Sequence, residues 1–386
     1  MRERITQARR WVIKVGSSLL TAEGRGLDHA LIQQWCEQIA ALRAAGSEVV
    51  LVSSGSIAAG LVRMDLDRKP SVLPQLQAAA ALGQTDLIDA YQRGFQPAGL
   101  QTAQVLLTHA DLANRQRYLN ARATLRTLLD YGAVPIVNEN DTVTTAEIRF
   151  GDNDTLAALV ANLISADVLV ILTDQEGLYT SDPRRNPDAS LLDEANATDP
   201  AVQALAGPAG TDIGSGGMRT KITAAERAAE SGTTTVIASG RCENILTRLA
   251  GGETLGTMLN SDRRPRHARK QWLANQLQVR GKLQVDAGAA MALQTRGVSL
   301  LAVGVIAADG NFKRGELVSV CDPDNVEVGR GLVNYSSEEV QQLVGRSSSE
   351  FAATLGYARE PELINRDNMV LSAPAAQSPT SAGAAS

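Results

Sequence analysis

The feature that most constrains this chain is a regular alternation of two kinds of segment over its first 260 residues. Short apolar runs rich in β-branched residues alternate with longer Ala- and Leu-rich segments of helical period. Strands and helices in strict alternation predict β-α-β crossovers, and therefore a mostly parallel sheet with helices on both faces. The apolar runs, such as VVLV and VLVIL, are nearly continuous, which is typical of strands in a sheet that is covered on both sides.

The alternation predicts the bounds of the individual elements. The predicted strands cover residues 11–16, 48–53, 102–107, 133–138, 167–173 and 234–238. The predicted helices cover residues 28–45, 74–93, 113–131, 155–165 and 218–231. Aromatic residues make up only 3% of the chain, so its core must consist of Ala, Leu, Val and Ile, as layered α/β packing allows. We expect a three-layer αβα sandwich over residues 1–260.

The alternation then stops. Residues 261–277 are interpreted as an exposed basic linker, because the run DRRPRHARK holds five Lys or Arg residues and a Pro. Residues 278–357 show short β-type runs between Gly, Asp and Asn turns, with one clear helix over 288–296, and predict a small, mostly β domain. The extension 358–386 becomes an Ala, Ser and Pro tract that we expect to be disordered from about residue 372.

Charge and cysteine content narrow the classes of function. The chain has 37 Lys and Arg against 42 Asp and Glu, a net charge of −5, which disfavours a binder of nucleic-acid phosphates. Cys36, Cys242 and Cys321 stand far apart, so we expect neither a disulfide framework nor a zinc knuckle, and we expect a cytoplasmic protein. No apolar run is long enough to span a membrane, and we expect no export signal.

Two motifs place anion-binding groups after predicted strands, although the sequence contains no P-loop and no G-x-G-x-x-G after the first strand. Lys14, followed by Gly16, Ser17 and Ser18, sets an ammonium beside backbone N–H groups at the carboxyl edge of the sheet. The alternative is a strand-end lysine that only reaches water. The run SSGSIAAG over residues 53–60 opens a helix whose free N–H groups attract a carboxylate or phosphate, unless it is a helix cap without a ligand.

Acidic and amide residues are unusually dense in N-E-N-D at residues 138–141 and G-D-N-D at residues 151–154. They are interpreted as solvated turns, as a calcium site, or as a site that recognises an ammonium group. The residue order of an EF-hand is not met, and Asn153 or Asp154 also suits a helix cap. Further on, LTDQEGLY closes a strand at residues 172–179. IGSGGMRTK at residues 213–221 forms a donor-rich loop suited to phosphates, or a glycine loop without a ligand.

Taken together and in this order, these motifs resemble the amino-acid kinase family, and within it the branch that phosphorylates glutamate. The resemblance runs from about Trp11 to Tyr357 and includes a C-terminal region similar to a PUA module. N-E-N-D followed by G-D-N-D separates this branch from the acetylglutamate, aspartate and uridylate kinases. The chain departs from the pattern at Ser215, where Thr is commoner, but the hydroxyl is kept.

The resemblance implies that ATP phosphorylates the side-chain carboxylate of L-glutamate, the first step toward proline, with Mg²⁺ bound mainly through ATP and no protein metal ligand assigned. It implies a homo-oligomer, proline as a feedback inhibitor and a glutamyl phosphate reductase as downstream partner. Lys14 and Lys221 are expected at the transferring phosphoryl group, with Asp152 orienting them. The expected glutamate-binding residues are Ser54, Gly55, Asn138, Asp141, Asn153 and Asp154. The expected ATP-binding residues are Lys14, Thr173, Asp174, Ser215, Gly216, Gly217, Met218, Arg219, Thr220 and Lys221.

An RNA-binding or RNA-regulated protein is the alternative, because PUA modules in other proteins bind RNA. Residues 278–357 contain seven Lys or Arg and nine Asp or Glu, so they lack the cationic surplus that RNA binding normally uses. We therefore expect a structural or regulatory module.

Overall fold

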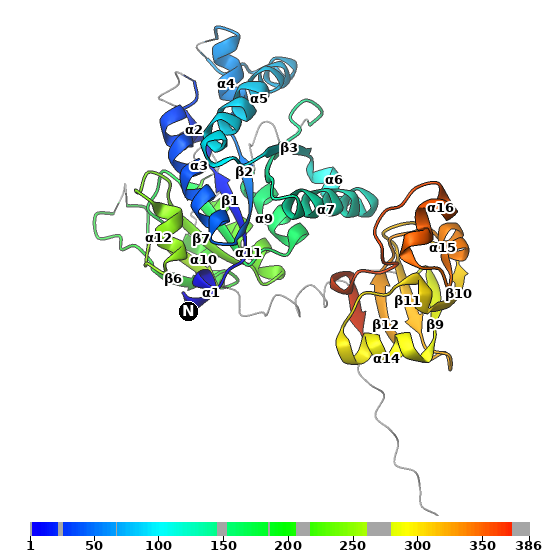
Figure 1. Ribbon diagram of the computed structural model, residues 1–386. Coiled ribbons are helices and arrows are strands. Elements are labelled where there is room, and N and C mark those ends of the chain that lie inside the picture. Colours follow the sequence, from blue (N-terminus) through cyan, green and yellow to red (C-terminus); the bar gives the residue numbers. More distant parts are fainter. Residues whose placement is uncertain are drawn as a thin grey trace, which may run out of the picture. The chain divides into compact units, whose positions relative to one another are not determined.

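The chain divides into two compact units, Met1–Ala268 and Arg269–Ser386 (Figure 1). The computed structural model describes residues 2–21, 26–66, 68–144, 153–183, 186–205, 217–260 and 279–372. The predicted basic linker and the tail beyond residue 372 lie outside the described residues. None of the helices in the described part of the chain is both long enough and apolar enough to cross a membrane.

Within the described residues, the first unit is built on an eight-stranded sheet with the order β3-β4-β2-β1-β5-β7-β8-β6. Neighbouring strands are parallel, except for the antiparallel pair β7 and β8. The strands are β1 (Arg10–Val15), β2 (Glu48–Ser53), β3 (Thr102–Leu107), β4 (Val134–Glu139), β5 (Val168–Thr173), β6 (Glu194–Asn196), β7 (Thr234–Ser239) and β8 (Thr257–Asn260). The mostly parallel sheet predicted from the alternation of segments is confirmed.

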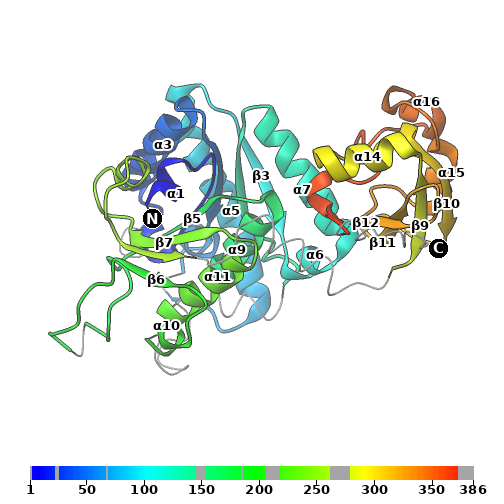
Figure 2. The same ribbon diagram turned by 90° about the horizontal axis from the view of Figure 1, so that it is seen from below.

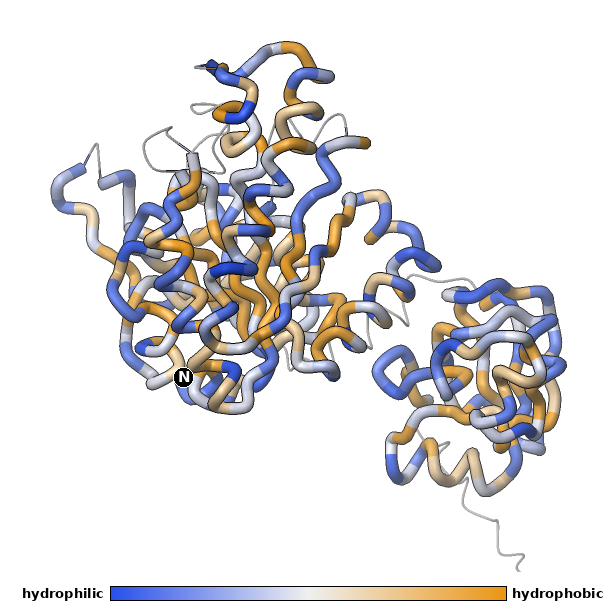
Figure 3. The backbone as a smooth tube through the Cα atoms, turned by 45° about the horizontal axis from the view of Figure 1, so that its top comes forward, coloured by the Kyte–Doolittle hydropathy of each residue, from blue (hydrophilic) through white to orange (hydrophobic). Residues whose placement is uncertain are grey.

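Helices cover both faces of this sheet because successive strand side chains point to opposite sides. Ile13 joins a core that packs against α3 and α5, whereas Val12 joins a core with α7, α9 and α11. Figures 1 and 2 show these two layers, and Figure 3 shows the apolar strands between them. The helices are α1 (Glu3–Thr6), α2 (Ser17–Leu20), α3 (His29–Ala44), α4 (Ser56–Arg63), α5 (Leu73–Phe95), α6 (His109–Ala113), α7 (Arg115–Asp130), α9 (Asn153–Ile164), α10 (Pro200–Leu205), α11 (Met218–Glu230) and α12 (Ile245–Ala250), with a 3₁₀ turn η1 (Gln96–Ala98).

The second unit is a small β-rich domain, as predicted, but it contains more helix than the sequence analysis expected. Its five-stranded sheet has the order β10-β9-β11-β12-β13, with the strands β9 (Gly281–Val285), β10 (Val305–Gly310), β11 (Leu317–Cys321), β12 (Glu327–Leu332) and β13 (Met369–Leu371). The predicted helix corresponds to α14 (Ala287–Arg296), and α15 (Ser337–Leu343) and α16 (Phe351–Leu355) are additional, with 3₁₀ turns η2 (Ala302–Gly304), η3 (Ser348–Glu350) and η4 (Arg366–Asn368). A capping box between Ser336 and Glu339 starts α15. The S-x-x-E pattern of these residues is the sequence signal that could have predicted this helix.

Candidate active site

Several predicted site residues lie at the carboxyl ends of four neighbouring strands, β4, β2, β1 and β5. Parallel strands place these ends at one edge of the sheet, where ligands of open α/β sheets bind. Lys14 lies near the end of β1, Ser54 directly after β2, Asn138 near the end of β4, and Thr173 at the end of β5. Segments that are far apart in the sequence therefore meet at a single place.

Two lysines converge on Asp154, the second residue of α9. The Nζ of Lys14 lies 2.6 Å from Asp154 Oδ1, and the Nζ of Lys221 lies 3.1 Å from Oδ2. The hydroxyl of Thr220 also donates to Oδ2, at 2.7 Å. Because α11 begins at Met218, Lys221 stands one turn into that helix and reaches the start of α9. All three charged groups are buried, and Asp154 is only 1% exposed.

The charge of Asp154 is maintained by its partners. Burial alone would raise the pKa of this carboxyl, but the two ammonium groups of Lys14 and Lys221 outweigh that effect and hold the pKa below its usual range. Two neighbouring cations would otherwise repel each other, and the ionised carboxylate between them removes most of that cost. The arrangement keeps two cationic donors side by side at the edge of the sheet.

A second cluster, of uncharged groups, adjoins the first. Asn153, the first residue of α9, donates from Nδ2 to Ser54 Oγ at 2.9 Å and to Asn138 Oδ1 at 3.0 Å. Asn138 in turn donates to Ser56 Oγ at 3.2 Å. The three expected substrate residues Ser54, Asn138 and Asn153 are thus brought together, whereas Asp154 belongs to the lysine cluster.

The loop between β2 and α4 depends on a glycine. Gly55 has φ = +99°, a left-handed conformation that other residues rarely adopt. A Cβ atom there would also meet the Cβ and Cδ1 atoms of Leu20 at 3.3 Å. Glycine therefore lets the chain turn sharply from the end of β2 into the first turn of α4, whose first backbone N–H groups have no acceptor within the helix.

Asp141 supplies a carboxylate with unusual proton affinity. Its Oδ2 accepts a hydrogen bond from Ser56 Oγ at 3.4 Å. Burial and the neighbouring charge of Glu139 raise the pKa of Asp141 to about 7. Glu139 itself is buried and lies 3.4 Å from His109 Nδ1. A cationic ligand group beside Asp141 would favour its ionised form.

The predicted nucleotide residues are partly within the described chain. Thr173 is buried at the end of β5 and donates to Asp174 Oδ1 at 3.0 Å, and Asp174 is exposed. Gly217, Met218, Arg219 and Thr220 lead into or begin α11 beside the lysine cluster. Asp152, Ser215 and Gly216 lie outside the described residues. The carboxylate found to bridge the two lysines is Asp154, which we had expected near the substrate.

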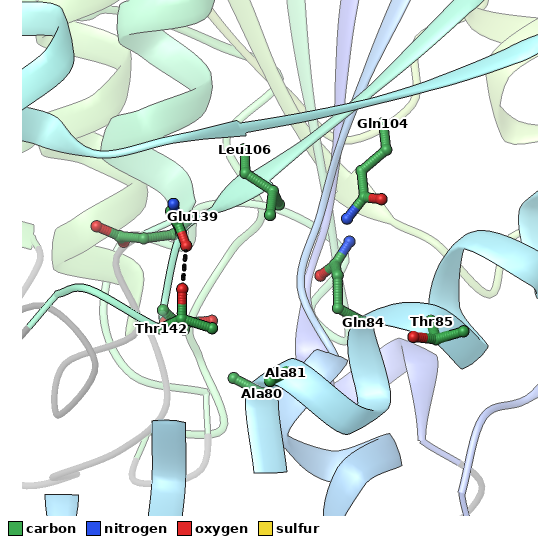
Figure 4. A pocket seen from close by; sticks show the side chains of 10 residues that line it. Ala80, Ala81, Gln84, Thr85, Gln104, Leu106, Glu139 and Thr142 are labelled. Carbon is green, nitrogen blue, oxygen red and sulfur yellow. Dashed lines mark hydrogen bonds between the residues drawn. The ribbon is translucent and has the colours of Figure 1, made fainter. Parts of the chain in front are cut away.

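Sequence reasoning missed the contribution of α5. Gln84 accepts a hydrogen bond from Asn138 Nδ2 at 2.8 Å, and the hydroxyl of Tyr91 lies 2.9 Å from Ser53 Oγ. Gln84 also lines a cavity of about 220 Å³ together with Glu139, Asp141 and Gln104 (Figure 4). A signal was present, because Gln84 and Tyr91 stand seven residues apart on a helix face that is otherwise apolar or glycine.

Two family models match this chain. Residues 9–239 match the amino acid kinase family, and residues 281–355 match the PUA domain. The glutamate 5-kinase of Stutzerimonas stutzeri is 57% identical over 371 residues, which cover 96% of this chain and 100% of that protein. A glutamate 5-kinase of Pseudomonas putida is 56% identical with the same coverage. The chain therefore belongs to the amino acid kinase family, groups with glutamate 5-kinases and carries a C-terminal PUA domain.

Proposed function

We propose that this protein transfers the γ-phosphoryl group of ATP to the side-chain carboxylate of L-glutamate, forming L-glutamyl 5-phosphate and ADP. The observation that carries the proposal is the start of α9, where two consecutive residues serve different clusters. Asn153 joins the amide and hydroxyl cluster, and Asp154 joins the two lysines. A site for a polar amino acid thus adjoins a cationic site for a phosphoryl group. The similarity to glutamate 5-kinases over 96% of the chain supports glutamate as the acceptor.

The reaction needs positioning and charge compensation rather than a base. A glutamate side chain has a pKa of about 4.3, so its carboxylate is already ionised near neutral pH. One carboxylate oxygen forms a bond to the γ-phosphorus of ATP, while the bond from that phosphorus to the bridging oxygen breaks and ADP leaves. The obstacle is the repulsion between an anion and a polyanion, which cationic donors at the transferring group offset.

We assign this charge compensation to Lys14 and Lys221. An ammonium group has three N–H donors, and the bond to Asp154 uses one of them on each lysine. Asp154 holds the two ammonium groups close together, and it also fixes their direction. The backbone N–H of Gly55 and the hydroxyls of Ser17 and Ser18 are assigned supporting roles. The backbone N–H of Gly16 instead donates to the carbonyl oxygen of Leu172 at 3.2 Å.

The α-ammonium and α-carboxylate of glutamate are the handles for binding. We assign the ammonium to Asp141 and Asn153, because a carboxylate and an amide oxygen are both acceptors. Ser54 and Gly55 offer a hydroxyl and a backbone N–H for the α-carboxylate. Asn138 and Asp154, both expected to lie near the substrate, are assigned to holding these groups in place.

ATP is assigned to the region between β5 and α11, with Thr173, Asp174 and residues 215–221 as its binding residues. Mg²⁺ accompanies ATP in this proposal and neutralises part of the phosphate charge. In the described part of the chain, no three Asp, Glu, His or Cys side chains gather into a group that could hold a metal ion. Both oxygens of Asp154 are engaged by lysines. We assign the ion mainly to ATP oxygens and water.

An assay of ADP release tests the function. The purified protein with ATP and Mg²⁺ should release ADP in the presence of L-glutamate, and much less with aspartate, N-acetylglutamate or uridylate. Hydroxylamine should trap the acyl phosphate as a hydroxamate, and the Lys14→Ala variant serves as the negative control. Release of ADP with another acceptor but not with glutamate would refute the proposal.

The proposal extends to the assembly, regulation and cell compartment of the protein. We infer a cytoplasmic homo-oligomer that is inhibited by proline competing for the glutamate site. Its acyl phosphate product would pass to a glutamyl phosphate reductase, which consumes it by reduction. The RNA-binding alternative is not favoured, since the PUA unit lacks a cationic surplus. Salt-dependent retention on an RNA column would contradict this choice.

A further inference from the structure

Three buried side-chain amides behind the substrate pocket form a connected chain of hydrogen bonds, which we name the amide relay. It consists of Gln84 on α5, Asn138 on β4 and Asn153 on α9. Asn153 Nδ2 donates to Asn138 Oδ1 at 3.0 Å, and Asn138 Nδ2 donates to Gln84 Oε1 at 2.8 Å. All three side chains are more than nine-tenths buried. The relay therefore connects α5, on one face of the sheet, with α9, whose second residue is Asp154 of the lysine cluster.

Backbone groups that contact Asn138 and Asn153 set the direction of the relay. The backbone N–H of Glu139 donates to Asn138 Oδ1 at 2.9 Å, and a backbone N–H can only donate. Asn153 Nδ2 lies 3.3 Å from the carbonyl oxygen of Ser53, which can only accept. The side-chain nitrogen of Asn138 must then face Gln84, and the side-chain oxygen of Gln84 must accept the hydrogen bond.

Asn138, at the centre of the relay, has no capacity left for a ligand. A side-chain amide can donate twice and accept twice. Asn138 donates to Ser56 and Gln84, and it accepts from Asn153 and from the backbone of Glu139. Its expected contact with the substrate is therefore replaced by a role in holding Asn153.

At one end of the relay, an acceptor atom has no hydrogen-bond donor among the described residues. Asn153 Oδ1 is buried and has no hydrogen-bond partner in the described part of the chain. A buried acceptor without a partner costs about 1–3 kcal/mol, so such an atom calls for a donor from elsewhere. At the other end, Gln84 Nε2 is likewise without a partner among the described residues, and it borders the cavity seen in Figure 4.

We propose that Gln84 is a positioning residue for recognition of the substrate's amino group, because it holds Asn138, and through it Asn153, with the carbonyl oxygen of Asn153 presented to the α-ammonium. This inference rests on the proposed function. An amide held in the opposite orientation would present N–H groups and repel a cation. Gln84 thus favours an amino acid over a dicarboxylic acid of the same length by holding Asn138 and Asn153 in place.

The test compares glutamate with glutarate, which lacks only the amino group. In Gln84→Met, the side chain keeps its length and loses its acceptor. We expect KM for glutamate to rise about tenfold, which corresponds to about 1.4 kcal/mol. The Ki of glutarate as a competitive inhibitor should stay within about twofold, so the ratio of the two constants falls about tenfold. We expect kcat and KM for ATP to change little.

Two controls separate positioning from loss of structure. Gln92→Met carries the same substitution at an exposed position on the same helix and should leave both constants unchanged. Gln84→Glu keeps an acceptor for Asn138, and its charge does not repel an ammonium, so it should retain the preference for glutamate. If Gln84→Met fails to fold, Gln84→Asn, whose amide is one methylene too short to reach Asn138, takes its place.

The outcomes separate the inference from the function. The positioning role of Gln84 would be overturned if Gln84→Met raised KM for glutamate and Ki for glutarate equally, or changed neither. It would also be overturned if Gln84→Glu lost the preference for glutamate over glutarate. If the unmodified protein releases no ADP with glutamate, the proposed function fails first. If it does, failure of the glutarate comparison counts against Gln84 alone.

Discussion

At the scale of single residues, the first turn of α9 explains how one short segment serves two kinds of chemistry. Consecutive helical residues point about 100° apart, so neighbours on a helix start face different surroundings. Asn153 turns toward the ends of β2 and β4, whereas Asp154 turns toward Lys14 on β1 and Lys221 on α11. The proposed acceptor site and the proposed phosphoryl site are therefore held at a fixed separation by the backbone of a single helix.

The two lysines should contribute mainly to turnover. Lys14→Ala and Lys221→Ala are each expected to lower kcat by a factor on the order of 10² or more, because a preorganised cationic donor at a transferring phosphoryl group is lost. Steady-state ADP release measures the effect, and thermal denaturation shows whether the variant is folded. Arg63→Ala, which removes an exposed cation paired with Asp86, is the matched control. A folded lysine variant with unchanged kcat would exclude that lysine from the mechanism.

Asp141 should make glutamate binding depend on pH. Burial and Glu139 raise the pKa of this carboxyl to about 7, so it is protonated below that pH and anionic above it. Since the anion is the form that attracts an ammonium, KM for glutamate should fall as the pH rises from about 6 to about 8. Ionisation within the fold also costs stability, so Asp141 lowers the free energy of unfolding as the pH rises from about 4 to about 7.

The Asp141→Asn variant is the control for this pH dependence. It should show a higher KM for glutamate that stays flat over the same range, with KM for ATP nearly unchanged. A KM for ATP that rises instead would mean that this loop serves the nucleotide.

The motif residues themselves could be predicted from the sequence, but the direction of each side chain could not. G-D-N-D contains two carboxylates, and their spacing does not tell which one faces the lysines. The structure places Asp154 between them because α9 begins at Asn153, and a shift of that start by one residue would rotate every side chain in the turn. Glu139 was visible in N-E-N-D, yet its effect on Asp141 depends on burial, which sequence spacing does not report.

At the scale of whole elements, α5 is the support of the substrate site. Gln77, Gln84 and Tyr91 recur every seven residues, and each binds a different segment at the strand ends. Gln77 donates to the carbonyl of Thr144 at 3.0 Å, Gln84 accepts from Asn138, and Tyr91 lies against Ser53. A spacing of seven keeps residues on one face of a helix, so α5 contacts the end of β2, the end of β4 and the segment that follows β4.

Close packing of α4 on α5 should be essential for this support. A Cβ atom on Gly83 would lie 1.9 Å from the carbonyl oxygen of Ser56 and 2.3 Å from the backbone nitrogen of Gly60. Backbone atoms of a helix cannot move aside, so Gly83→Ala should lower the free energy of unfolding by about 3 kcal/mol or more. It should also raise KM for glutamate, because α4 begins at Ser56. Urea denaturation measures the first effect.

Gly251→Ala is the matched control for Gly83→Ala. The backbone there has φ = −73°, and the nearest atoms to an added Cβ lie at 3.4 and 3.5 Å, which is ordinary contact. Its stability should change by less than about 0.5 kcal/mol. If Gly83→Ala proves equally harmless, the two helices can separate without damage, and α5 does not hold the loop rigidly.

Most long elements of the first unit could be predicted because their apolar period is strong. The predicted strands over 48–53 and 102–107 have the bounds of β2 and β3, and the other predicted elements differ from the structure by a residue or two at one or both ends. The strands β6 and β8 were not predicted, because they are only three and four residues long and lie at one edge of the sheet. Their pairing is decided by contact with β7 and with each other, which is tertiary information.

At the scale of the whole molecule, each unit has its own hydrophobic core. The two large clusters of the first unit draw their buried residues from between Ile5 and Leu259. The main cluster of the second unit runs from Leu283 to Met369. A domain with its own core is able to fold alone. Every proposed ligand-binding residue belongs to the first of these units.

A fragment that ends in the basic linker should therefore fold and act as a kinase. We expect residues 1–264 to retain glutamate-dependent ADP release within about threefold of the full chain, because the lysine cluster, the amide relay and α5 all lie before that cut. Circular dichroism and urea denaturation establish folding, and ADP release measures activity. Assembly and sensitivity to proline are the properties that the cut is free to change. A folded fragment without activity would mean that the PUA unit completes the active site, and the assignment of catalysis to the first unit alone would then be wrong.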